Sequence, residues 1–293
     1  MIRSLLLTLA LVAVPLTASA QAHDYKHAPP PYSIPFQLRP AAVPNALRMD
    51  TSFAFHDALP GSESKHTIAS IFTGIVRITP QLGAIARIGV VSTSDATVLT
   101  NPVVGGHYLI PLSDDVRLAL FLGVAAPLGQ GGGDEPNLVK ASAIGAGVLA
   151  RAAFDNALFA PNYLTIFPGA SIAYVANKVT VQAEATMFTL LRARGPAAQE
   201  TRINLTTGLH VGYFVIPELS VGAELRYQRF LKHELLADKP GVDNFTVGAG
   251  VRGHFKLRDT RWLRPGLAYT RGLDPPMTTA HYNIVQLDVL FIF

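Results

Sequence analysis

The segment from Asn283 to Phe293, NIVQLDVLFIF, alternates between two kinds of side chain with a period of two. Successive side chains of a β-strand point to opposite faces of the sheet. One face of this segment would therefore carry Val285, Leu287, Val289, Phe291 and Phe293, and the other would carry Gln286 and Asp288. A sheet built from such strands has one apolar face along its whole length, and lipid or a second layer must cover that face.

The same period of two continues from Leu47 to the end of the chain and predicts twelve strands. They cover residues 47–56, 66–78, 82–92, 101–111, 116–125, 163–175, 179–191, 202–215, 219–230, 244–257, 262–272 and 282–293. Strands of this length can cross a bilayer when tilted, which takes ~9–11 residues. Tight turns alternate with longer loops between them, which is typical of an antiparallel up-and-down barrel. Ten or fourteen strands are the alternative counts if the middle of the chain divides differently.

Charged and other polar side chains of these strands gather on one face, which in a barrel would be the lumen. The predicted lumen-lining residues are Arg87, Arg117, Glu184, His210, Glu224, Arg226, Arg252, His254, Lys256, Arg264 and Asp288. An Arg or Lys on the lipid face near the bilayer centre costs ~2–4 kcal/mol. The segregation therefore favours a transmembrane barrel over a soluble two-layer sandwich, whose strands would alternate as well.

The inward charges have two compatible interpretations. As structural elements, the three acidic residues Glu184, Glu224 and Asp288 would pair with arginines on neighbouring strands and brace the wall. The expected arginine partners are Arg226, Arg252 and Arg264. As functional elements, they would set the electric field in a water-filled channel, and the surplus of basic residues would favour anions. Aromatic residues near the strand ends are expected to form a girdle at the membrane interfaces: Tyr213, Tyr227, Trp262, Tyr269 and Phe293.

The long connection from Pro127 to Asn162 has a different composition from the strands. Residues 140–154 are rich in Ala and contain no Pro, which favours a helix, and Asn137 is a good N-cap residue. We expect a short helix in the third outer loop. Two further strands in residues 138–159 are the alternative.

The N-terminal region has two predicted parts. Residues 1–20 have the features of a signal peptide: a basic residue, Arg3, an apolar stretch from Leu5 to Leu16, and the small-residue site Ala18-Ser19-Ala20. An uncleaved anchor is the alternative. Residues 21–46 contain six prolines, which cannot donate ladder hydrogen bonds, so an extended arm is expected there, lying in the periplasm or inside the barrel as a plug. The barrel itself would cover residues 47–293.

The composition excludes several kinds of chemistry. The chain has no Cys, which rules out disulfides and thiolate metal sites, and its net charge of +4 comes without a basic run for nucleic acid. His233-Glu234 lacks the second His of a zinc-protease motif. Outer-membrane barrel lipases carry Ser two residues after the catalytic His, and no His of this chain is followed by Ser at that spacing. Barrel proteases use Asp and His at the outer rim, where Asp57 near His56 and Asp274 near His281 are the only candidates considered. We therefore predict no enzymatic activity, no metal and no cofactor.

Both ends of the chain resemble those of bacterial outer-membrane barrels. In that class, the terminal Phe and alternate apolar residues such as Val285, Leu287, Val289, Phe291 and Phe293 serve in recognition by the barrel-assembly machinery. Residues 47–293 also resemble the outer-membrane barrels of the MetA pathway, which are tied to phenol degradation, at Asn101-Pro102, Ala126-Pro127-Leu128-Gly129, Asn162 to Pro168 and Arg264-Pro265-Gly266. That resemblance implies passive uptake of a small hydrophobic or aromatic molecule.

Taken together, these patterns predict an all-β, roughly twelve-stranded barrel in the outer membrane of a Gram-negative bacterium. We expect a passive channel or transporter for a small solute, in contact with outer-membrane lipid and not with nucleic acid. The alternative is a structural or adhesive barrel that transports nothing because side chains and the Pro-rich arm fill its lumen.

Overall fold

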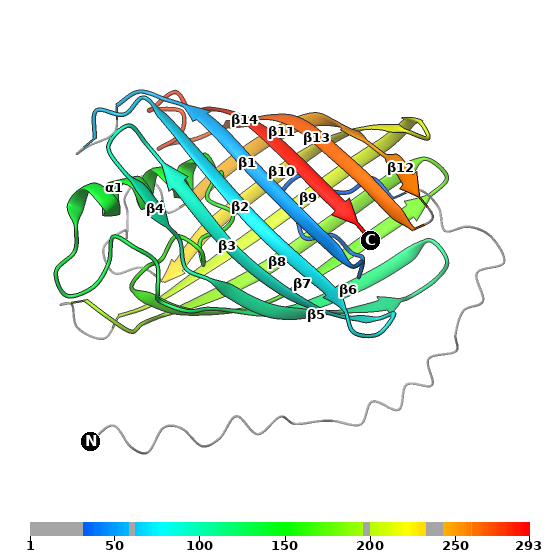
Figure 1. Cartoon of the computed structure of the whole chain (residues 1–293), viewed down its shortest axis with the longest axis horizontal. Coiled ribbons are helices and arrows are strands. Elements are labelled where there is room, and N and C mark those ends of the chain that lie inside the picture. The colour runs from blue at the N-terminus through cyan, green and yellow to red at the C-terminus, as the bar shows by residue number, and fades with distance from the viewer. Residues whose placement is uncertain (1–31, 59–61, 196–199, 233–242, 259) are drawn as a thin grey trace, which may run out of the picture.

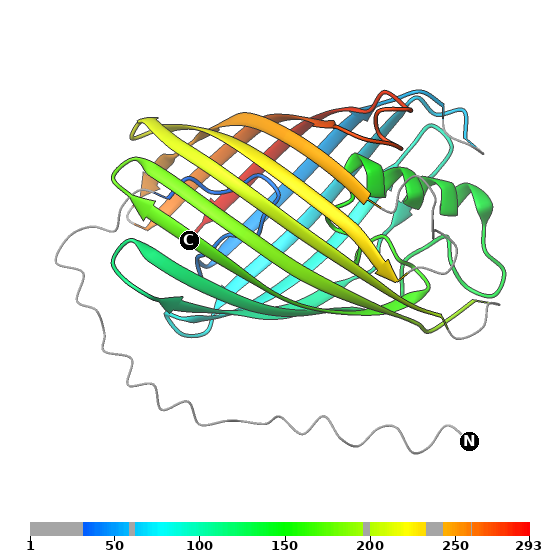
Figure 2. The same ribbon diagram turned by 180° about the vertical axis from the view of Figure 1, so that it is seen from behind.

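The fold is a closed antiparallel β-barrel, seen here in a computed structural model that describes residues 32–58, 62–195, 200–232, 243–258 and 260–293 (Figures 1 and 2). The predicted signal peptide and residues 21–31 of the predicted arm lie outside the described residues. The strands are β1 (Ala46–Phe55), β2 (His66–Arg77), β3 (Leu82–Ser92), β4 (Thr97–Leu99), β5 (Val103–Pro111), β6 (Val116–Ala125), β7 (Tyr163–Ala176), β8 (Val179–Arg192), β9 (Thr201–Ile216), β10 (Leu219–Lys232), β11 (Asp243–Gly253), β12 (Phe255–Arg258), β13 (Arg261–Gly272) and β14 (Asn283–Ile292).

Twelve strands form the ring of the barrel. The short β4 pairs only with β3, and β12 follows β11 directly and pairs with the same neighbour, β13. The ring closes where β1 pairs with β14 in register from Ala46 with Ile292 to Phe55 with Asn283. Closure gives each of the twelve ring strands a hydrogen-bonded neighbour on both sides. The predicted all-β barrel of twelve strands is confirmed.

Alternation along the strands separates an apolar outer surface from a polar interior. Each ring strand carries at least one large exposed apolar side chain near its middle or end, for example Leu47, Phe72, Ile88, Val104, Leu120, Ile172, Met187, Leu209, Val221, Val247, Leu267 and Leu287. Exposed charges on the described strands lie close to strand ends, as at Arg77 and Arg271. The period of two in the sequence therefore assigned most residues to the correct face.

Trp262 is a correction to the expected aromatic girdle. On β13, Leu267 and Tyr269 are exposed on the outer surface, and Trp262 has the opposite parity. Its side chain lines a cavity inside the barrel and lies beneath the guanidinium of Arg264, 5.2 Å from the ring centroid. Parity along the strand, rather than closeness to the strand end, decides the face of this residue.

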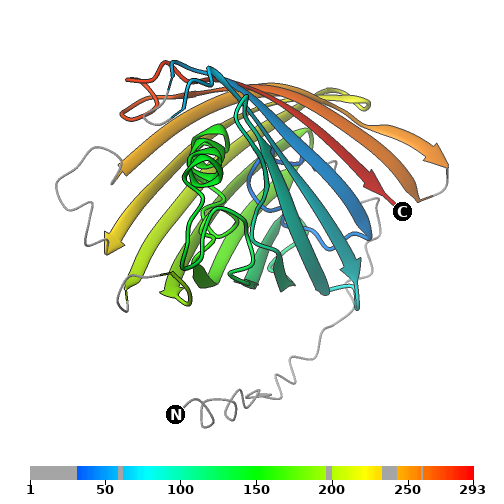
Figure 3. The ribbon, with the colours of Figure 1, turned by 60° about the vertical axis from the view of Figure 1, so that its left-hand side comes forward.

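The long loop between β6 and β7 contains the helix α1 (Leu138–Ala150), as expected from its Ala-rich sequence. The side chain of Asn137 accepts a hydrogen bond from the backbone N–H of Lys140 at 3.0 Å, so it is the predicted N-cap. The helix starts directly after this N-cap and ends at Ala150, four residues before the end of the Ala-rich stretch. It lies across the end of the barrel that carries the long loops, which we call the loop end (Figure 3).

The loop packs into the barrel through an apolar cluster. Small residues of α1, such as Ala143 and Ala150, and larger residues after it, such as Leu158 and Phe159, are buried together with wall residues. Wall residues in this cluster come from several strands and include Ala54, Ile71, Val91, Val103, Phe167, Phe188 and Ile284. The cluster fixes α1 and residues 151–162 inside the loop end.

Residues 32–45, the described part of the Pro-rich segment, lie inside the opposite end of the barrel, which carries the short turns and which we call the turn end (Figure 2). Tyr32, Ile34 and Ala41 are buried in a second apolar cluster with wall residues, among them Ile75, Ala119, Val175 and Leu290. We call residues 32–45 the arm. The barrel interior is thus occupied from both ends, by the arm at the turn end and by the α1 loop at the loop end.

Candidate functional site: the lumen and its cavity

Two wall carboxylates bind the backbone N–H groups of the arm. Glu224 on β10 accepts from the N–H of Phe36 at 2.5 Å and from that of Gln37 at 3.2 Å. Glu184 on β8 accepts from the N–H of Arg39 at 2.7 Å and pairs with the guanidinium of the same residue at 2.5 Å. An extended segment inside a closed barrel has no strand edge to pair with, so side chains must satisfy its backbone.

Wall donors bind the backbone carbonyls of the arm in the same way. Arg252 on β11 donates to the carbonyl of Ile34 at 3.1 Å and to that of Pro35 at 3.3 Å, and Gln286 on β14 donates to that of Phe36 at 2.9 Å. Arg48 on β1 also donates to the carbonyl of Pro35, at 3.2 Å. The inward charges of the strands therefore hold the arm in place, a role that neither sequence interpretation included.

A second charge cluster anchors the α1 loop. Arg151, directly after α1, donates to both carboxylate oxygens of Asp50 on β1 at 2.7 Å, to Ser52 at 3.0 Å and to Asp155 at 3.2 Å. Asp155 pairs in turn with Arg87 on β3 at 2.8 Å. We call Asp50, Arg87, Arg151 and Asp155 the loop anchor.

The electrostatics of the loop anchor favour the charged forms of its two loop residues, Arg151 and Asp155. Burial opposes ionisation of Arg151, but Asp50 and Asp155 outweigh it and raise the pKa of that guanidinium above its ordinary value. Burial likewise raises the pKa of Asp155, but Arg87 and Arg151 more than compensate and hold it well below the usual range for a carboxyl group. Arg151 and Asp155 therefore stay ionised and paired at neutral pH.

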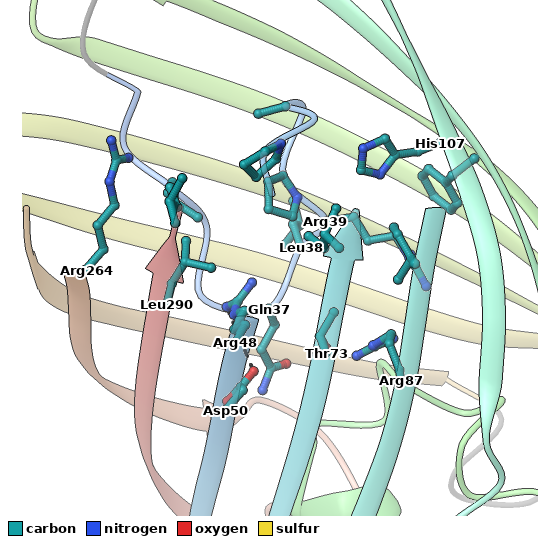
Figure 4. Close-up of a pocket in the computed structure, with 18 of the residues that line it drawn as sticks. Gln37, Leu38, Arg39, Arg48, Asp50, Thr73, Arg87, His107, Arg264 and Leu290 are labelled. Carbon is teal, nitrogen blue, oxygen red and sulfur yellow. Dashed lines mark ion pairs between the residues drawn. The ribbon is translucent and has the colours of Figure 1, made fainter. Parts of the chain in front are cut away.

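Between the arm and the wall lies a cavity of about 580 Å³ (Figure 4). Most of its surface is apolar and comes from branched aliphatic and aromatic side chains of the strands. Figure 4 shows Arg48, Asp50 and Gln37 in the middle of the cavity wall, with Arg264 and Leu290 to one side and Arg87 and His107 to the other. The lining residues come from the arm, from β1, β2, β3, β5, β6, β7, β9, β13 and β14, and from the connections that contain Pro217 and His254.

Five arginines line this cavity, and they fall into two groups. Arg39, Arg48 and Arg87 each pair with a carboxylate, Glu184 at 2.5 Å, Asp288 at 2.8 Å and Asp155 at 2.8 Å. Arg117 and Arg264 have no carboxylate partner within the described ranges.

The two unpaired arginines both contact Tyr32 of the arm and stack on aromatic rings. The guanidinium of Arg117 lies over the Tyr32 ring at 4.5 Å, and Arg264 reaches the Tyr32 carbonyl at 3.5 Å while stacking on Trp262. The cavity therefore carries a surplus of positive charge.

Several polar atoms on the cavity wall have no hydrogen-bond partner in the described part of the chain. They are the side-chain amide of Gln37, Nε2 of His107, Nδ1 of His254 and Nε of Arg264. The other ring nitrogen of His254 is 2.8 Å from the hydroxyl of Ser220. Buried polar groups are normally satisfied by protein or by ordered water, so a bound water is expected beside these atoms.

The predicted lumen residues fall into three places. Glu184, His210, Glu224, Arg226, Arg252 and Asp288 are buried inside the wall or against the arm, with Asp288 shared between Arg48 and Arg252. Arg87, Arg117, His254 and Arg264 line the cavity. Lys256 lies on β12 beyond the ring contacts of β11, is exposed, and does not line the cavity.

The expected cross-strand pairing of the inward charges is right for only some of them. Asp288 on β14 pairs with Arg48 on the neighbouring strand β1, and also with Arg252 on β11, two strands away around the ring. Arg226 lies 4.0 Å from Glu224 on its own strand, β10. Glu184 pairs with Arg39 of the arm, and Arg264 has no carboxylate partner among the described residues. Sequence reasoning missed Arg39, Arg48, Asp50, Arg151 and Asp155. Arg48 and Asp50 have the lumen-facing parity of β1 and could have been found from it, whereas the others lie outside strands.

The outer rim differs from the arrangement considered for a protease. Asp57 pairs with His281 at 2.6 Å across two loops, and both side chains are well exposed to solvent. Asp274 instead accepts hydrogen bonds from the backbone N–H of Phe245 at 2.9 and 3.0 Å. Residues 233 and 234 lie outside the described residues.

Within the described ranges, no three metal-ligating side chains come together. In the same part of the chain, no helix has the length and apolar character required to cross a bilayer.

Comparison with known proteins gives similarity at the level of the fold only. No protein-family model matches the chain, and no curated protein sequence matches it. Among solved structures, it is similar to the NanC porin (TM-score 0.49, 8% identity, 84% of this chain and 98% of that one) and to the KdgM porin (0.45, 10%, 84% and 99%). It is also similar to the translocator domain of the autotransporter NalP from Neisseria meningitidis (0.45, 10%, 84% and 86%).

Proposed function

We propose that this chain is an outer-membrane β-barrel whose exterior faces lipid. The apolar side chains exposed on the ring strands, one or more per strand, form a belt that water would solvate poorly. Exposed charges near the strand ends, such as Arg77 and Arg271, would lie in the headgroup regions or the aqueous phase. The closed ring satisfies the strand backbone internally, which a spanning segment in hydrocarbon requires.

We further propose that the barrel is a passive channel for a small solute and that it favours anions. The observation that supports this function best is the cavity of about 580 Å³ beside the arm, lined by Arg117 and Arg264 without carboxylate partners in the described residues. A small anion would be attracted by this surplus charge, and the apolar wall would accommodate a hydrophobic or aromatic part. Passage through the turn end would require the arm to shift, and passage through the loop end would require the α1 loop to shift.

Ion selectivity in planar lipid bilayers tests the channel. With a salt gradient across the bilayer, we expect a reversal potential that indicates anion preference. Arg117→Glu together with Arg264→Glu should move it toward cation preference. Arg271→Glu, at an exposed residue with the outward parity of β13, should leave it unchanged. An unaltered reversal potential in the double variant contradicts the proposed role of the two arginines. Arg226 and Arg252 are unsuitable for this test because they are buried against their partners, with only 2% and 1% of their surface exposed.

A structural or adhesive barrel that transports nothing is the second candidate. Occupation of the lumen from both ends, by the arm and by the α1 loop, favours it. Single-channel recording of the intact protein and of a variant lacking residues 21–45 separates the two. Stepwise currents in either protein support a channel, and silence in both supports the packed barrel.

The C-terminal strand supports a proposal about assembly. Val285, Leu287, Val289 and Phe291 have the outward parity of β14, and Phe293 is exposed just after it. We propose that these side chains are recognised by the barrel-assembly machinery. Phe293→Ala should lower the fraction of heat-modifiable, folded barrel in outer-membrane fractions, and Phe55→Ala, an exposed residue at the end of β1, should change it less.

A further inference from the structure

We propose that the cavity between the arm and the wall is a binding site for a small carboxylate with an aromatic or compact apolar body. This inference rests on the proposed channel only for how the ligand would arrive. The site itself is defined by the described residues. Tyr32 of the arm forms part of it, so the arm contributes to the ligand site as well as obstructing the lumen.

The size of the cavity fits one small organic molecule. Pockets that enclose small organic ligands have volumes of roughly 300–1,000 Å³, and this cavity has about 580 Å³. A bare inorganic anion would leave most of the apolar wall facing water. An oligomeric or folded ligand would exceed the space that the arm leaves.

The apolar wall is suited to an aromatic ring. Phe121, Phe167, Phe214 and Trp262 line the cavity, together with Tyr32. Aromatic rings prefer stacked or edge-to-face contacts with other rings, which add to the stabilisation from apolar burial. A planar apolar body would thus gain more here than a fully polar one.

The charge of the site calls for one negative group on the ligand. Arg117 and Arg264 both contact Tyr32 but have no carboxylate partner among the described residues, while the other three arginines of the cavity do. A carboxylate would complete their hydrogen bonding in a charge-assisted form, which is stronger than neutral hydrogen bonding.

The site is also preorganised. Glu184 and Glu224 hold the arm through its backbone, and Arg39 stacks on Phe121 at 4.4 Å while pairing with Glu184. A ligand would therefore enter a cavity whose walls are already in place, which lowers the entropic cost of binding.

Trp262 provides a direct test, because it is the only tryptophan of the chain and it lines the cavity. The intact protein in detergent is titrated with benzoate, with the neutral benzamide and with benzylammonium while Trp262 fluorescence is followed. We expect saturable quenching by benzoate, binding at least about tenfold weaker for benzamide, and none for the cation, since a charged hydrogen bond in a buried site contributes about this much or more. Equal affinities for benzoate and benzamide, or no saturation, overturn the proposal.

Variants locate the interaction. Arg117→Gln and Arg264→Gln should each weaken benzoate binding by about tenfold and leave benzamide binding unchanged, while Arg264→Lys should retain the preference for the anion. The matched control is Arg271→Gln, an exposed residue at the other end of the same strand, β13. Loss of the heat-modified band shift identifies any variant that has not folded. Unchanged benzoate affinity in both folded Gln variants overturns the proposal.

Conductance measured on the same preparations distinguishes this proposal from the channel. Benzoate binding with these specificities in a barrel that shows no current supports the site and refutes the channel. Currents without selective benzoate binding refute the site and leave the channel standing.

Discussion

The loop anchor gives the strongest quantitative prediction, for the variant Arg151→Met. The wild-type guanidinium is fully buried and donates to both oxygens of Asp50 at 2.7 Å and to Asp155 at 3.2 Å. Methionine fills a similar length of space but provides no charge and no donor. The substitution therefore leaves two buried carboxylates without their main common partner.

The size of the effect follows from what remains around each carboxylate. Removing one member of a buried ion pair costs roughly 3–5 kcal/mol. Asp155 keeps Arg87 at 2.8 Å, and Asp50 keeps Gln286 at 2.8 Å and a more distant Arg48 at 3.9 Å. These remaining contacts place the expected loss at the lower end, roughly 3 kcal/mol of the free energy of unfolding.

Urea titration of the barrel in lipid vesicles measures this loss. The control Arg271→Met removes an exposed guanidinium and should change the free energy of unfolding by less than about 0.5 kcal/mol. Adding Asp50→Asn to Arg151→Met should recover part of the loss, because one uncompensated charge disappears. A loss below about 1 kcal/mol for Arg151→Met, in the range of an exposed ion pair, would refute the view that this cluster anchors the α1 loop.

Three further predictions concern the arm, pH and the outer surface. The hydroxyls of Ser33 in the arm and Ser220 in the wall lie 3.3 Å apart, and the chain has no Cys, so the double variant Ser33→Cys/Ser220→Cys should form a disulfide between arm and wall. If solute passage requires the arm to shift, this disulfide should lower the conductance, and a reductant should restore it. Equal currents with and without reductant contradict this prediction. The pKa of Asp155 in the folded protein lies below its unfolded value of ~3.9, so the stabilisation from this carboxylate is complete above pH ~3.9 and is lost only as the pH falls through the lower folded pKa. The conductance should therefore show no transition due to Asp155 between pH 7 and about 4. A transition in that range that Asp155→Asn abolishes would contradict this prediction. Leu120 lies on the outer surface in the middle of β6, so Leu120→Arg should destabilise the barrel in vesicles by ~2–4 kcal/mol. The control Leu128→Arg, in the adjoining loop, should be nearly neutral. Equal urea midpoints for the two variants would contradict a lipid-facing belt.

The wall of the barrel could be predicted from sequence because the side chains of a strand alternate between two faces, so that apolar and polar residues repeat with a period of two. The strand expected at residues 82–92 is found as Leu82–Ser92, and the turn-and-loop alternation fixed the even strand number. The helix in the third long loop followed from its Ala content and from Asn137. The short β4 was not predicted, since its three residues are too few to show an alternation.

The interior could be predicted only in part, because the period of two gives the face of a residue and not its partner. Glu184 was assigned to the lumen, but nothing in its strand indicates that it binds Arg39 of the arm. Arg151 and Asp155 belong to a loop that folds back into the barrel. Arg151 binds Asp50, 101 residues away in the chain, and Asp155 pairs with Arg87 on β3. Long-range pairs of this kind depend on the closed geometry and leave no local pattern.

The binding of the arm through its backbone has a consequence for the order of assembly. Its partners are distributed around the circumference, on β8, β10, β11, β14 and, beside the arm itself, β1. Although the arm precedes every strand in the chain, its peptide groups find all of their partners only after the seam between β1 and β14 has joined. The arm is therefore synthesised before the strands but completes its hydrogen bonds only after them, and protection of its amide hydrogens from exchange would report that the cylinder is complete.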